Sequence, residues 1–378
     1  MRVIIAGGGT GGHVFPGLAI AEEMKRRDDS IDVIFVGTEH GIEAKVVPRE
    51  GYPLRYVRAE GIVGVSIARK IKALVSLFLS FIDSFRIIKT IKPDVVIGTG
   101  GYASGTVVLM AVLKSIPTII LEQNTIPGMT NKILGRFVDS ICITYQDSMT
   151  YFPRGKTFLT GNPVRNQVLR GSIESAYKLF SLEKDLFTIL VFGGSSGARS
   201  INRAIVDSLP YLYDIREGIQ FLHQTGQMDY EFVRHEYIKH GIKGTIAPFI
   251  FQMGEAYAVA DIVISRAGAT TLAEITALGK PSILIPYPYA TGGHQEFNAR
   301  KLVEMNAARM LLDNELSGES ISREIKEMYS DESLRDEMKK NSKIIGRPDA
   351  TEKIVDIVFS LTKQSILKTQ KVGFYTNV

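Results

Sequence analysis

Four glycine-rich turns recur along this chain of 378 residues, and each follows a short apolar run and precedes a helix-like pattern. The turns span residues 7–12, 98–105, 193–198 and 266–271. Glycine lets the backbone approach a ligand closely, and the free amides at the start of the following helix favour an anion. The repeated order of strand, turn and helix predicts parallel sheets built from β–α–β units, with ligands at the carboxyl ends of the strands.

The apolar runs predict where the strands lie, and they fall into two series. Strands are expected at residues 3–6, 32–36, 94–97, 118–121, 141–144, 188–192, 220–224, 262–265 and 282–286. The second series restarts the pattern of the first, because the run 188–192 leads into a glycine turn as the run 3–6 does. The chain is also long enough for two domains with separate cores. We therefore expect an α/β protein with two Rossmann-like, doubly wound parallel-sheet domains facing each other across a cleft.

The boundary between the two domains is expected at the turn Gly161-Asn-Pro163, whose composition is typical of a break between elements. The N-terminal domain would span residues 1–163 and the C-terminal domain residues 164–345. An acidic helix start at Asp349-Ala-Thr-Glu352, directly after a proline, predicts a last helix that runs to about residue 363. Residues 364–378 show no clear period and stay unassigned.

Charge and cysteine content exclude some classes of protein. The net charge of +5, with acidic and basic residues mostly interspersed, does not indicate a nucleic-acid partner. The single Cys142 lies in an apolar run, which predicts a core residue and fits a reducing compartment. The first strand follows Met1 at once and leaves no room for a signal segment. We therefore expect the protein to stay in the cytoplasm.

The first turn contains Gly7-x-Gly-x-x-Gly12, the spacing of a dinucleotide-binding fingerprint. The fingerprint also needs an acidic residue at the end of the second strand. That strand ends Phe35-Val-Gly-Thr38, which disfavours a nicotinamide enzyme. His13 directly follows the glycines at the mouth of the helix, where an imidazole can accept a proton near neutral pH. Position alone is equally compatible with His13 capping the helix or contacting a phosphate.

Polar residues at other predicted turns are further candidates for binding. Ser195 and Ser196 add hydroxyl groups to the third turn. Glu274 lies on the helix after the fourth turn, where a carboxylate can accept two neighbouring sugar hydroxyls, although an ordinary exposed helix glutamate gives the same pattern. Amide and charged groups of the same kind are Gln123, Asn124, Asn162, Arg165 and those of residues 289–298. The scattered histidines and the lack of an Asp-x-Asp pair indicate no metal site, and no cofactor is expected.

The segment from Ile67 to Ile88 combines helical apolar spacing with basic flanks. Its apolar positions are Ile71, Leu74, Val75, Phe78, Phe81, Ile82, Phe85 and Ile88, and its flanking basic residues are Arg69, Lys70, Lys72, Arg86, Lys89 and Lys92. The apolar run is too short to span a bilayer. A core helix explains the spacing. A helix lying on an anionic membrane explains both the spacing and the basic flanks.

Seven motifs occur in the order of a known family between residue 1 and about residue 350. They are Gly8-Gly-Thr-Gly-Gly-His-Val-Phe-Pro-Gly17, Gly98-Thr-Gly-Gly-Tyr-Ala-Ser-Gly105, Glu122-Gln-Asn124, Gly161-Asn-Pro-Val-Arg165, Gly193-Gly-Ser-Ser-Gly-Ala-Arg199, Ser265-Arg-Ala-Gly-Ala269 and His294-Gln-x-x-Asn298. Together they closely resemble the MurG family within glycosyltransferase family 28, the UDP-N-acetylglucosamine transferases of peptidoglycan synthesis.

The resemblance implies a GT-B fold whose last helix crosses back to the first domain. It implies an inverting, metal-independent hexosyltransferase that moves N-acetylglucosamine from UDP-N-acetylglucosamine to the 4-hydroxyl of the muramyl sugar of lipid I (undecaprenyl-diphospho-muramyl-pentapeptide), forming lipid II. It further implies a peripheral protein at the cytoplasmic face of the cell membrane, docked on anionic lipid through the segment from Ile67 to Ile88. The chain has no tryptophan, so this segment would dock through Phe and Leu alone.

The resemblance also implies roles for individual residues. His13 matches the family's proposed general base, Glu274 would bind the ribose and the backbone of Ile250 the uracil. The other donor contacts would be Thr10, Gly11, Gly12, Asn124, Arg165, Ser195, Ala269, Thr270, Thr271, Gln295 and Asn298. The acceptor contacts would be Gly100, Gly101, Tyr102 and Ser104.

Alternatives to this function stay open at the level of the sequence. The nearest is a related GT-B lipid glycosyltransferase of the diacylglycerol glucosyltransferase type, which would differ in the loops of the first domain. A nucleotide-sugar epimerase on the same fold is a second, and it should carry extra acidic and basic groups in the cleft. A redox enzyme is disfavoured by the end of the second strand.

Overall fold

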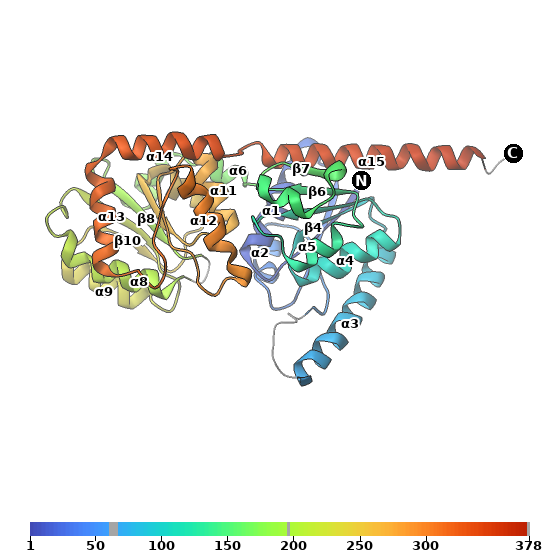
Figure 1. Ribbon diagram of the computed structural model, residues 1–378, viewed down its shortest axis with the longest axis horizontal. Helices are drawn as coiled ribbons and strands as arrows, with labels where there is room; N and C mark the ends of the chain where they lie inside the picture. Colours follow the sequence, from blue (N-terminus) through green and yellow to red (C-terminus); the bar gives the residue numbers. More distant parts are fainter. Residues whose placement is uncertain (60–66, 195–196, 376–378) are drawn as a thin grey trace. The chain divides into compact units, whose positions relative to one another are not determined.

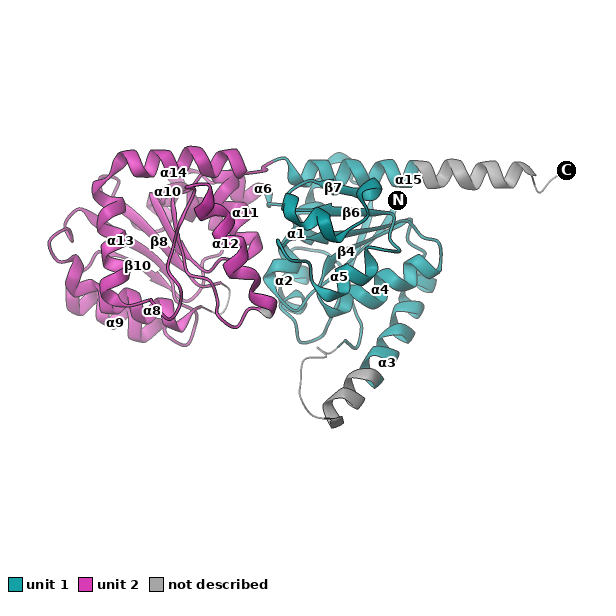
Figure 2. Cartoon of the chain, viewed as in Figure 1, with its two compact units in different colours: residues 1–165, 349–378 teal, residues 166–348 magenta. Residues whose placement is uncertain are grey.

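The computed structural model describes residues 1–59, 67–194 and 197–375, with the backbone alone at residues 67–74, 291 and 364–375. The chain forms two compact units (Figure 2). Unit 1 comprises Met1–Arg165 and Asp349–Val378, and unit 2 comprises Asn166–Pro348. The chain therefore leaves unit 1 two residues after the expected boundary at residue 163.

Unit 1 is a seven-stranded parallel sheet with the strand order β3-β2-β1-β4-β5-β6-β7 and helices on its two faces (Figure 1). Its strands are β1 (Arg2–Gly7), β2 (Asp32–Gly37), β3 (Leu54–Tyr56), β4 (Val95–Gly100), β5 (Thr118–Glu122), β6 (Ser140–Ile143) and β7 (Thr157–Leu159). Its helices are α1 (Gly11–Arg27), α2 (Glu43–Arg49), α3 (Ile67–Ile91), α4 (Tyr102–Leu113), α5 (Met129–Leu134) and α15 (Ala350–Tyr375), with short 3-10 turns η1 (Gln146–Tyr151) and η2 (Arg154–Lys156).

Unit 2 is a six-stranded parallel sheet with the strand order β10-β9-β8-β11-β12-β13. Its strands are β8 (Phe187–Phe192), β9 (Ile219–Gln224), β10 (Gly244–Ala247), β11 (Ile262–Ser265), β12 (Ser282–Leu284) and β13 (Arg309–Met310). Its helices are α6 (Asn166–Leu169), α7 (Ile173–Leu179), α8 (Arg199–Ser208), α9 (Tyr230–His240), α10 (Met253–Val259), α11 (Ala269–Leu278), α12 (His294–Glu304), α13 (Gly318–Ser330) and α14 (Glu332–Ile345), with 3-10 turns η3 (Leu209–Leu212) and η4 (Thr291–Gly293).

In each sheet the strand order runs outward in both directions from two central strands. This confirms the prediction of two doubly wound parallel sheets. In unit 1 the strand order turns at β1 and β4, and in unit 2 it turns at β8 and β11. The four glycine-rich turns lie at the carboxyl ends of these four strands. Ligands of doubly wound folds bind outside the carboxyl ends of the strands at such switch points. Each unit therefore has one candidate ligand edge, with two glycine turns on it.

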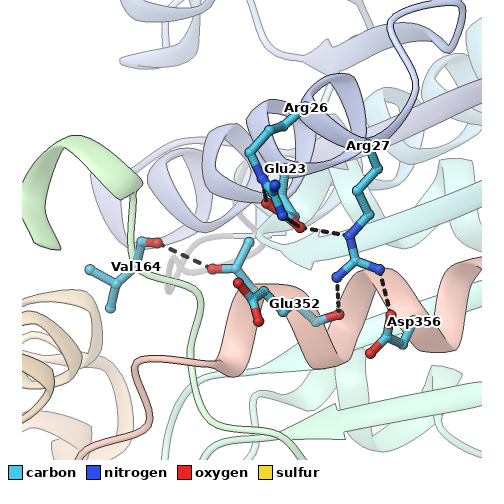
Figure 3. Close-up of polar contacts among 7 residues, drawn as sticks. Glu23, Arg26, Arg27, Val164, Glu352 and Asp356 are labelled. Atoms are coloured by element: carbon cyan, nitrogen blue, oxygen red, sulfur yellow. Dashed lines mark hydrogen bonds and ion pairs between the residues drawn. The ribbon is translucent and has the colours of Figure 1, made fainter. Parts of the chain in front are cut away.

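The last helix belongs to the first unit, although 183 residues separate it from the rest of that unit in the chain. The side chains of Ile354, Val355 and Val358 are fully buried in a cluster with β1, β2 and α1. At its start, Thr351 Oγ1 donates to the carbonyl oxygen of Val164 at 3.1 Å, and Arg27 of α1 bonds α15 as well (Figure 3). The helix runs to Tyr375, so it includes most of the tail that had no expected structure.

The single cysteine of the chain lies in the core, where the sequence predicts it. Cys142 in β6 is 2% exposed and has no disulfide partner. Burial in the apolar core raises the pKa of its thiol to about 12. The prediction of a core residue is confirmed.

Candidate functional site

The first glycine turn brings the start of α1 close to the end of β1. Gly9 has a φ of +86°, a left-handed conformation that favours glycine. Thr10 is the extended N-cap of α1, and its side chain makes no capping hydrogen bond. Gly11 and Gly12 then begin the helix. The turn therefore leads directly into a helix N-terminus, the kind of position at which proteins bind anions.

His13 lies in the first turn of α1 and is held by a backbone carbonyl of the neighbouring strand. Its Nδ1 lies 3.0 Å from the carbonyl oxygen of Thr99 at the end of β4. A carbonyl can only accept a hydrogen bond, so Nδ1 must carry the proton. The neutral ring then has its lone pair on Nε2, which is the form that can take a proton from a substrate.

The surroundings of His13 keep the imidazole neutral at physiological pH. Burial lowers the pKa of His13 below its ordinary value of 6.5, while the bond to Thr99 and the negative charge of Glu43 act in the opposite direction. A general base must be unprotonated before it reacts. His13 therefore combines the required protonation state with a fixed tautomer.

The second glycine turn makes room for this imidazole. Gly100 and Gly101 have φ values of +110° and +82°. A Cβ atom on Gly100 would lie 2.5 Å from Nδ1 of His13, and one on Gly101 would lie 2.5 Å from the carbonyl oxygen of Gly8. The two turns at this edge of the sheet thus pack backbone against ring, and their glycines are needed for contact as well as for conformation.

A Gly100→Ala variant should displace His13 and strain the turn. We expect the free energy of unfolding to fall by about 1–3 kcal/mol, because alanine is forced into a left-handed conformation and against the ring. Transfer activity should fall with it. Gly128→Ala is the matched control, because a Cβ there meets nothing within 4 Å. Equal unfolding and activity for the two variants would contradict the close packing.

The turn after β5 is organised by a buried carboxylate. Glu122 is 2% exposed and accepts bonds from the amide of Asn124 at 3.0 Å and from Nδ2 of Asn131 at 2.8 Å. Burial raises the pKa of Glu122 above its usual range, against these bonds. Gln123 Nε2 donates to the carbonyl oxygen of Thr99 at 2.6 Å, the same oxygen that holds His13. Asn124 is therefore brought to the same edge of the sheet as His13.

Two other predicted residues contribute polar atoms that are buried without a partner among the described residues. The side-chain amide of Asn162 is 3% exposed and makes no hydrogen bond there, and neither does Nε of Arg165. The guanidinium of Arg165 lies 4.5 Å from the ring centroid of Phe15 on α1. Unpaired buried polar groups are costly, so these atoms are where a ligand would gain most from binding.

The predicted acceptor residues have different environments. Tyr102 begins α4 and is 47% exposed, whereas Ser104 is fully buried. The hydroxyl of Ser104 has no hydrogen-bond partner among the described residues, and it lies where a Cβ on Gly98 would approach to 2.6 Å. Tyr102 is therefore available at the surface of unit 1, while Ser104 packs beneath the turn.

In unit 2, one buried glutamine links the third glycine turn to the segment expected to bind uracil. Gln224, at the end of β9, donates from Nε2 to the carbonyl oxygen of Gly194 at 2.9 Å and accepts from the amide of Ile250 at 2.7 Å. The Ile250 amide is thus already bonded to Gln224, and a nucleobase could accept a hydrogen bond from this amide only if Gln224 released it. Ser195 lies outside the described residues.

The fourth turn leads into α11 and places Glu274 inside the unit. Gly268 is the N-cap of this helix, which begins with Ala269, Thr270 and Thr271. Glu274 is 7% exposed, and the hydroxyl of the fully buried Tyr257 donates to its Oε2 at 2.9 Å. The interpretation of Glu274 as an ordinary exposed helix residue is wrong. A carboxylate held in one orientation suits recognition of paired hydroxyls.

Arg266, in the fourth glycine turn, makes hydrogen bonds to several loops at this edge of the sheet. Its guanidinium donates to Asp313 at 2.6 Å, to Ser200 at 2.7 Å and to the carbonyl oxygens of Ile285 and Pro286. These partners come from the start of α8 and from the segments after β12 and β13. Arg266 therefore holds together three segments at this edge of unit 2 and connects them to the fourth glycine turn.

The polar segment at the start of α12 is also held by backbone contacts. Gln295 accepts a bond from the amide of Tyr287 at 2.9 Å, which orients its amide nitrogen the other way. Asn298 is fully buried one turn later. Gly292 and Gly293, with φ values of +62° and +68°, form the bend that leads into the helix. The segment presents fixed amide groups, as expected for sugar recognition.

On α3, Phe78 and Phe85 are exposed, whereas Phe81 is half-buried. Ser80 and Ser84 are fully buried and bond Thr106 of α4. Phe78 is 67% exposed and Phe85 is 38% exposed. The exposed face has Val75 and Leu77 as further apolar members and Arg86, Lys89 and Lys92 as exposed basic ones. Core burial therefore does not explain the exposed Val75, Phe78 and Phe85, whereas Ile88 of the same apolar stripe is buried in the core of unit 1.

Neither a membrane span nor a metal cluster occurs among the described residues. No helix there is long and apolar enough to cross a bilayer. No group of three or more His, Cys, Asp or Glu side chains in the same part of the chain is arranged to hold a metal ion.

Three buried residues at the two edges were not singled out from the sequence: Glu43, Gln224 and Tyr257. Each acts through a contact with a turn or a carboxylate distant in the chain. Only Glu43 had a local signal, since it follows two glycines in Gly37-Thr-Glu-His-Gly41-Ile-Glu43.

Comparison with known proteins gives the same answer for both units. Residues 3–143 match the model of the glycosyltransferase family 28 N-terminal domain, and residues 188–354 match that of its C-terminal domain. The chain is 51% identical over 364 residues to a UDP-N-acetylglucosamine–N-acetylmuramyl-(pentapeptide) pyrophosphoryl-undecaprenol N-acetylglucosamine transferase of Thermodesulfovibrio yellowstonii, covering 96% of this chain and 100% of the relative. A protein of the same name from Myxococcus xanthus is 47% identical, with 97% and 94% covered.

Solved structures extend the comparison. The crystal structure of MurG from Acinetobacter baumannii matches with a TM-score of 0.74 at 28% identity, covering 95% of this chain and 99% of that one. A UDP-GlcNAc 2-epimerase from Neisseria meningitidis matches with a TM-score of 0.66 at 14% identity, covering 95% and 100%. The second likeness is one of fold alone. With a match to each half of the family and relatives along nearly its whole length, this chain belongs to glycosyltransferase family 28.

Proposed function

We propose that this protein transfers N-acetylglucosamine from UDP-N-acetylglucosamine to the 4-hydroxyl of the muramyl sugar of lipid I, forming lipid II. The observation that carries the proposal is the imidazole of His13, neutral and fixed with its lone pair on Nε2 at a ligand edge of unit 1. The two relatives described above, at 51% and 47% identity, carry this activity in their names. The epimerase likeness, at 14% identity, gives no comparable support for the alternative.

In this mechanism unit 2 holds the donor. Glu274, oriented by Tyr257, accepts the ribose hydroxyls, and the backbone of Ile250, whose amide Gln224 holds in place, contacts the uracil. Thr270 and Thr271 at the start of α11 bond the diphosphate, with Ser195 of the third turn, and the helix N-terminus stabilises its charge. Gln295 and Asn298 bond the sugar hydroxyls.

Unit 1 holds the acceptor and the base. Nε2 of His13 takes the proton of the 4-hydroxyl as its oxygen attacks C1 of the donor sugar. The bond from C1 to the diphosphate oxygen breaks, and UDP leaves with the electron pair. Attack opposite the leaving group inverts the anomeric carbon and gives a β-1,4 bond. The turn at Gly100 and Gly101, with Tyr102, faces the acceptor diphosphate.

The transfer is tested with labelled UDP-N-acetylglucosamine and a lipid I analogue, with and without EDTA. We expect the label in the lipid fraction at equal rates in both arms, because the proposed site stabilises the leaving diphosphate with helix amides and hydroxyls instead of a metal. Free N-acetylglucosamine or an epimerised sugar nucleotide, without label in lipid, would exclude the transfer. Loss of transfer in EDTA, restored by a divalent cation, would exclude only the metal-independent form.

We further propose that the exposed face of α3 docks on the cytoplasmic face of the anionic cell membrane, where the polyprenyl acceptor lies. A Phe78→Glu variant should bind anionic vesicles at least about 10-fold more weakly, since burying a Phe side chain contributes about 1.5–3 kcal/mol and the new charge is repelled. Phe232→Glu on α9 is the matched control, with a side chain 46% exposed on unit 2. Equal vesicle sedimentation for wild type and Phe78→Glu would contradict docking through this face.

A further inference from the structure

Glu43 is a buried acidic residue in unit 1 that the proposed transfer does not yet use. It is the first residue of α2, next in the chain after β2, and it is 1% exposed. Within the described chain no Lys or Arg side chain pairs with it. A buried carboxylate without a basic partner is costly unless several donors bond it.

The donors come from the first glycine turn and from the end of β2. The amide of Gly9 donates to Oε2 of Glu43 at 2.8 Å. The amide and the hydroxyl of Thr38 both donate to Oε1, each at 2.8 Å. One carboxylate therefore joins two segments that are 29 residues apart in the chain. Bonds of this kind to a charged acceptor are among the stronger ones in proteins.

Three glycines form the socket into which the carboxylate fits. A Cβ atom on Gly8 or on Gly41 would lie 2.1 Å from an atom of the Glu43 side chain, and one on Gly37 would lie 2.5 Å away. Such distances exclude any side chain at these positions unless Glu43 moves. Contact with Glu43 thus explains the glycine at position 8 in the first glycine turn and those at positions 37 and 41 at and after the end of β2, without any ligand.

Glu43 also bears on the dinucleotide fingerprint, which requires an acidic residue at the end of the second strand. In that fingerprint, an acidic group near the end of the second strand binds the ribose of a cofactor. Here the acidic group near that strand end bonds the glycine turn itself. The amide of Gly9 is therefore engaged from inside the unit and is not a free donor for a phosphate.

The turn that Glu43 holds is the one that carries His13. Gly9 precedes Thr10, whose carbonyl oxygen accepts the amides of His13 and Val14 at 3.2 and 3.3 Å. The charge of Glu43 acts on His13 by raising the pKa of the imidazole, against the larger effect of burial. The guanidinium of Arg165 is a further charged group at this end of α1, and it lies 4.5 Å from the ring centroid of Phe15.

We propose that Glu43 is a positioning residue for the transfer: its carboxylate fixes the first glycine turn from within unit 1 and stabilises the imidazolium that His13 becomes when it takes the acceptor proton. This inference rests on the proposed role of His13 as base. Glu43 touches neither substrate nor reacting atom. It acts through the turn and through its charge.

A Glu43→Gln variant tests both effects, because one amide cannot accept from Thr38 and from Gly9 at once. We expect kcat to fall about 10- to 100-fold, in line with the strength of charge-assisted bonds, and KM for UDP-N-acetylglucosamine to stay within about threefold. The acid limb of the pH profile should move to lower pH, because loss of the negative charge lowers the pKa of His13 further. Imidazole NMR of the labelled protein measures that titration without any turnover.

Two further variants separate position from charge. Thr38→Val removes one hydroxyl bond to Glu43 but keeps its charge and its bond to Gly9, so kcat and the His13 titration should stay near wild type. Glu43→Asp keeps the charge but shortens the side chain, so kcat should fall while the titration changes little. This variant decides the matter if Glu43→Gln does not fold.

Two outcomes would overturn the inference about Glu43. One is a wild-type kcat in Glu43→Asp, and the other is a Glu43→Gln variant whose loss of activity comes with an unchanged His13 titration. Measuring His13→Ala beside them keeps the two proposals apart. Full turnover in His13→Ala removes the base itself, whereas an inactive His13→Ala with a fully active Glu43→Gln removes only the role of Glu43.

Discussion

A His13→Ala variant is expected to lose about 10²- to 10⁴-fold in kcat, the usual contribution of a positioned general base. The reason is the geometry of the imidazole, whose Nδ1 bonds the carbonyl oxygen of Thr99 and leaves Nε2 as the basic atom. The variant should bind UDP within about threefold of wild type, because the proposed donor contacts lie mainly on unit 2. Initial rates with a lipid I analogue and calorimetric UDP binding measure the two quantities.

His40→Ala is the matched control for this variant, because it removes an exposed histidine from the same unit. It should transfer at the wild-type rate. If His13→Ala kept full turnover with normal UDP binding, another group would have to take the acceptor proton. A parallel loss of UDP affinity would instead point to collapse of the glycine turn.

The wild-type pH profile should reflect the same imidazole. Burial lowers the pKa of His13 below 6.5, so the basic form predominates at pH 7 and the rate should be level there. As pH falls through the lowered pKa, the imidazole takes a proton and kcat/KM should decline. A decline that begins above pH 7 would contradict a base with this environment.

The second large effect is expected at the ribose. A Glu274→Ala variant should raise KM for UDP-N-acetylglucosamine about 10- to 100-fold, since hydrogen bonds to a charged group contribute about 1.5–3 kcal/mol. The carboxylate is 7% exposed and oriented by the hydroxyl of Tyr257. Its loss should leave kcat at saturating donor much less affected than KM.

The specific measurement is discrimination between UDP and 2′-deoxy-UDP. Wild type should bind UDP more tightly, whereas Glu274→Ala should bind the two nucleotides equally, because the group that reads the hydroxyl is gone. Tyr257→Phe keeps the carboxylate but loses one orienting bond, so it should weaken UDP binding by about 2- to 10-fold. Unchanged discrimination in Glu274→Ala would move ribose recognition elsewhere.

The central strands could be predicted from the sequence, and the edge strands could not. The strands β1, β4, β8 and β11 are buried along most of their length, and each contains at least three consecutive apolar residues. The strands β3, β7, β10 and β13 are short, lie at the sheet edges and are partly exposed. An edge strand packs against fewer neighbours, so its residues need not be apolar, and pairing with the adjacent strand defines it. No such pairing can be deduced from a local run.

The candidate site divides in the same way. The glycine turns and His13 could be identified because conformation and position relative to a strand are local properties. Glu43 and Gln224 could not, because their importance lies in bonds to Gly9 and Ile250, which are 34 and 26 residues away. The same limit applies to α3, where burial of Ser80 and Ser84 against Thr106 decides which face is outward. Apolar periodicity alone would place Phe78 and Phe85 on the face that packs against the core.

The most direct test of the proposed transfer is the linkage of its product. Nuclear magnetic resonance of the disaccharide released from the lipid product would show which hydroxyl carries N-acetylglucosamine and the configuration at its anomeric carbon. In-line attack assisted by His13 predicts a single β-linked product at the 4-hydroxyl of the muramyl sugar. An α-linked product, or N-acetylglucosamine on a different hydroxyl or on glycerol, would contradict it.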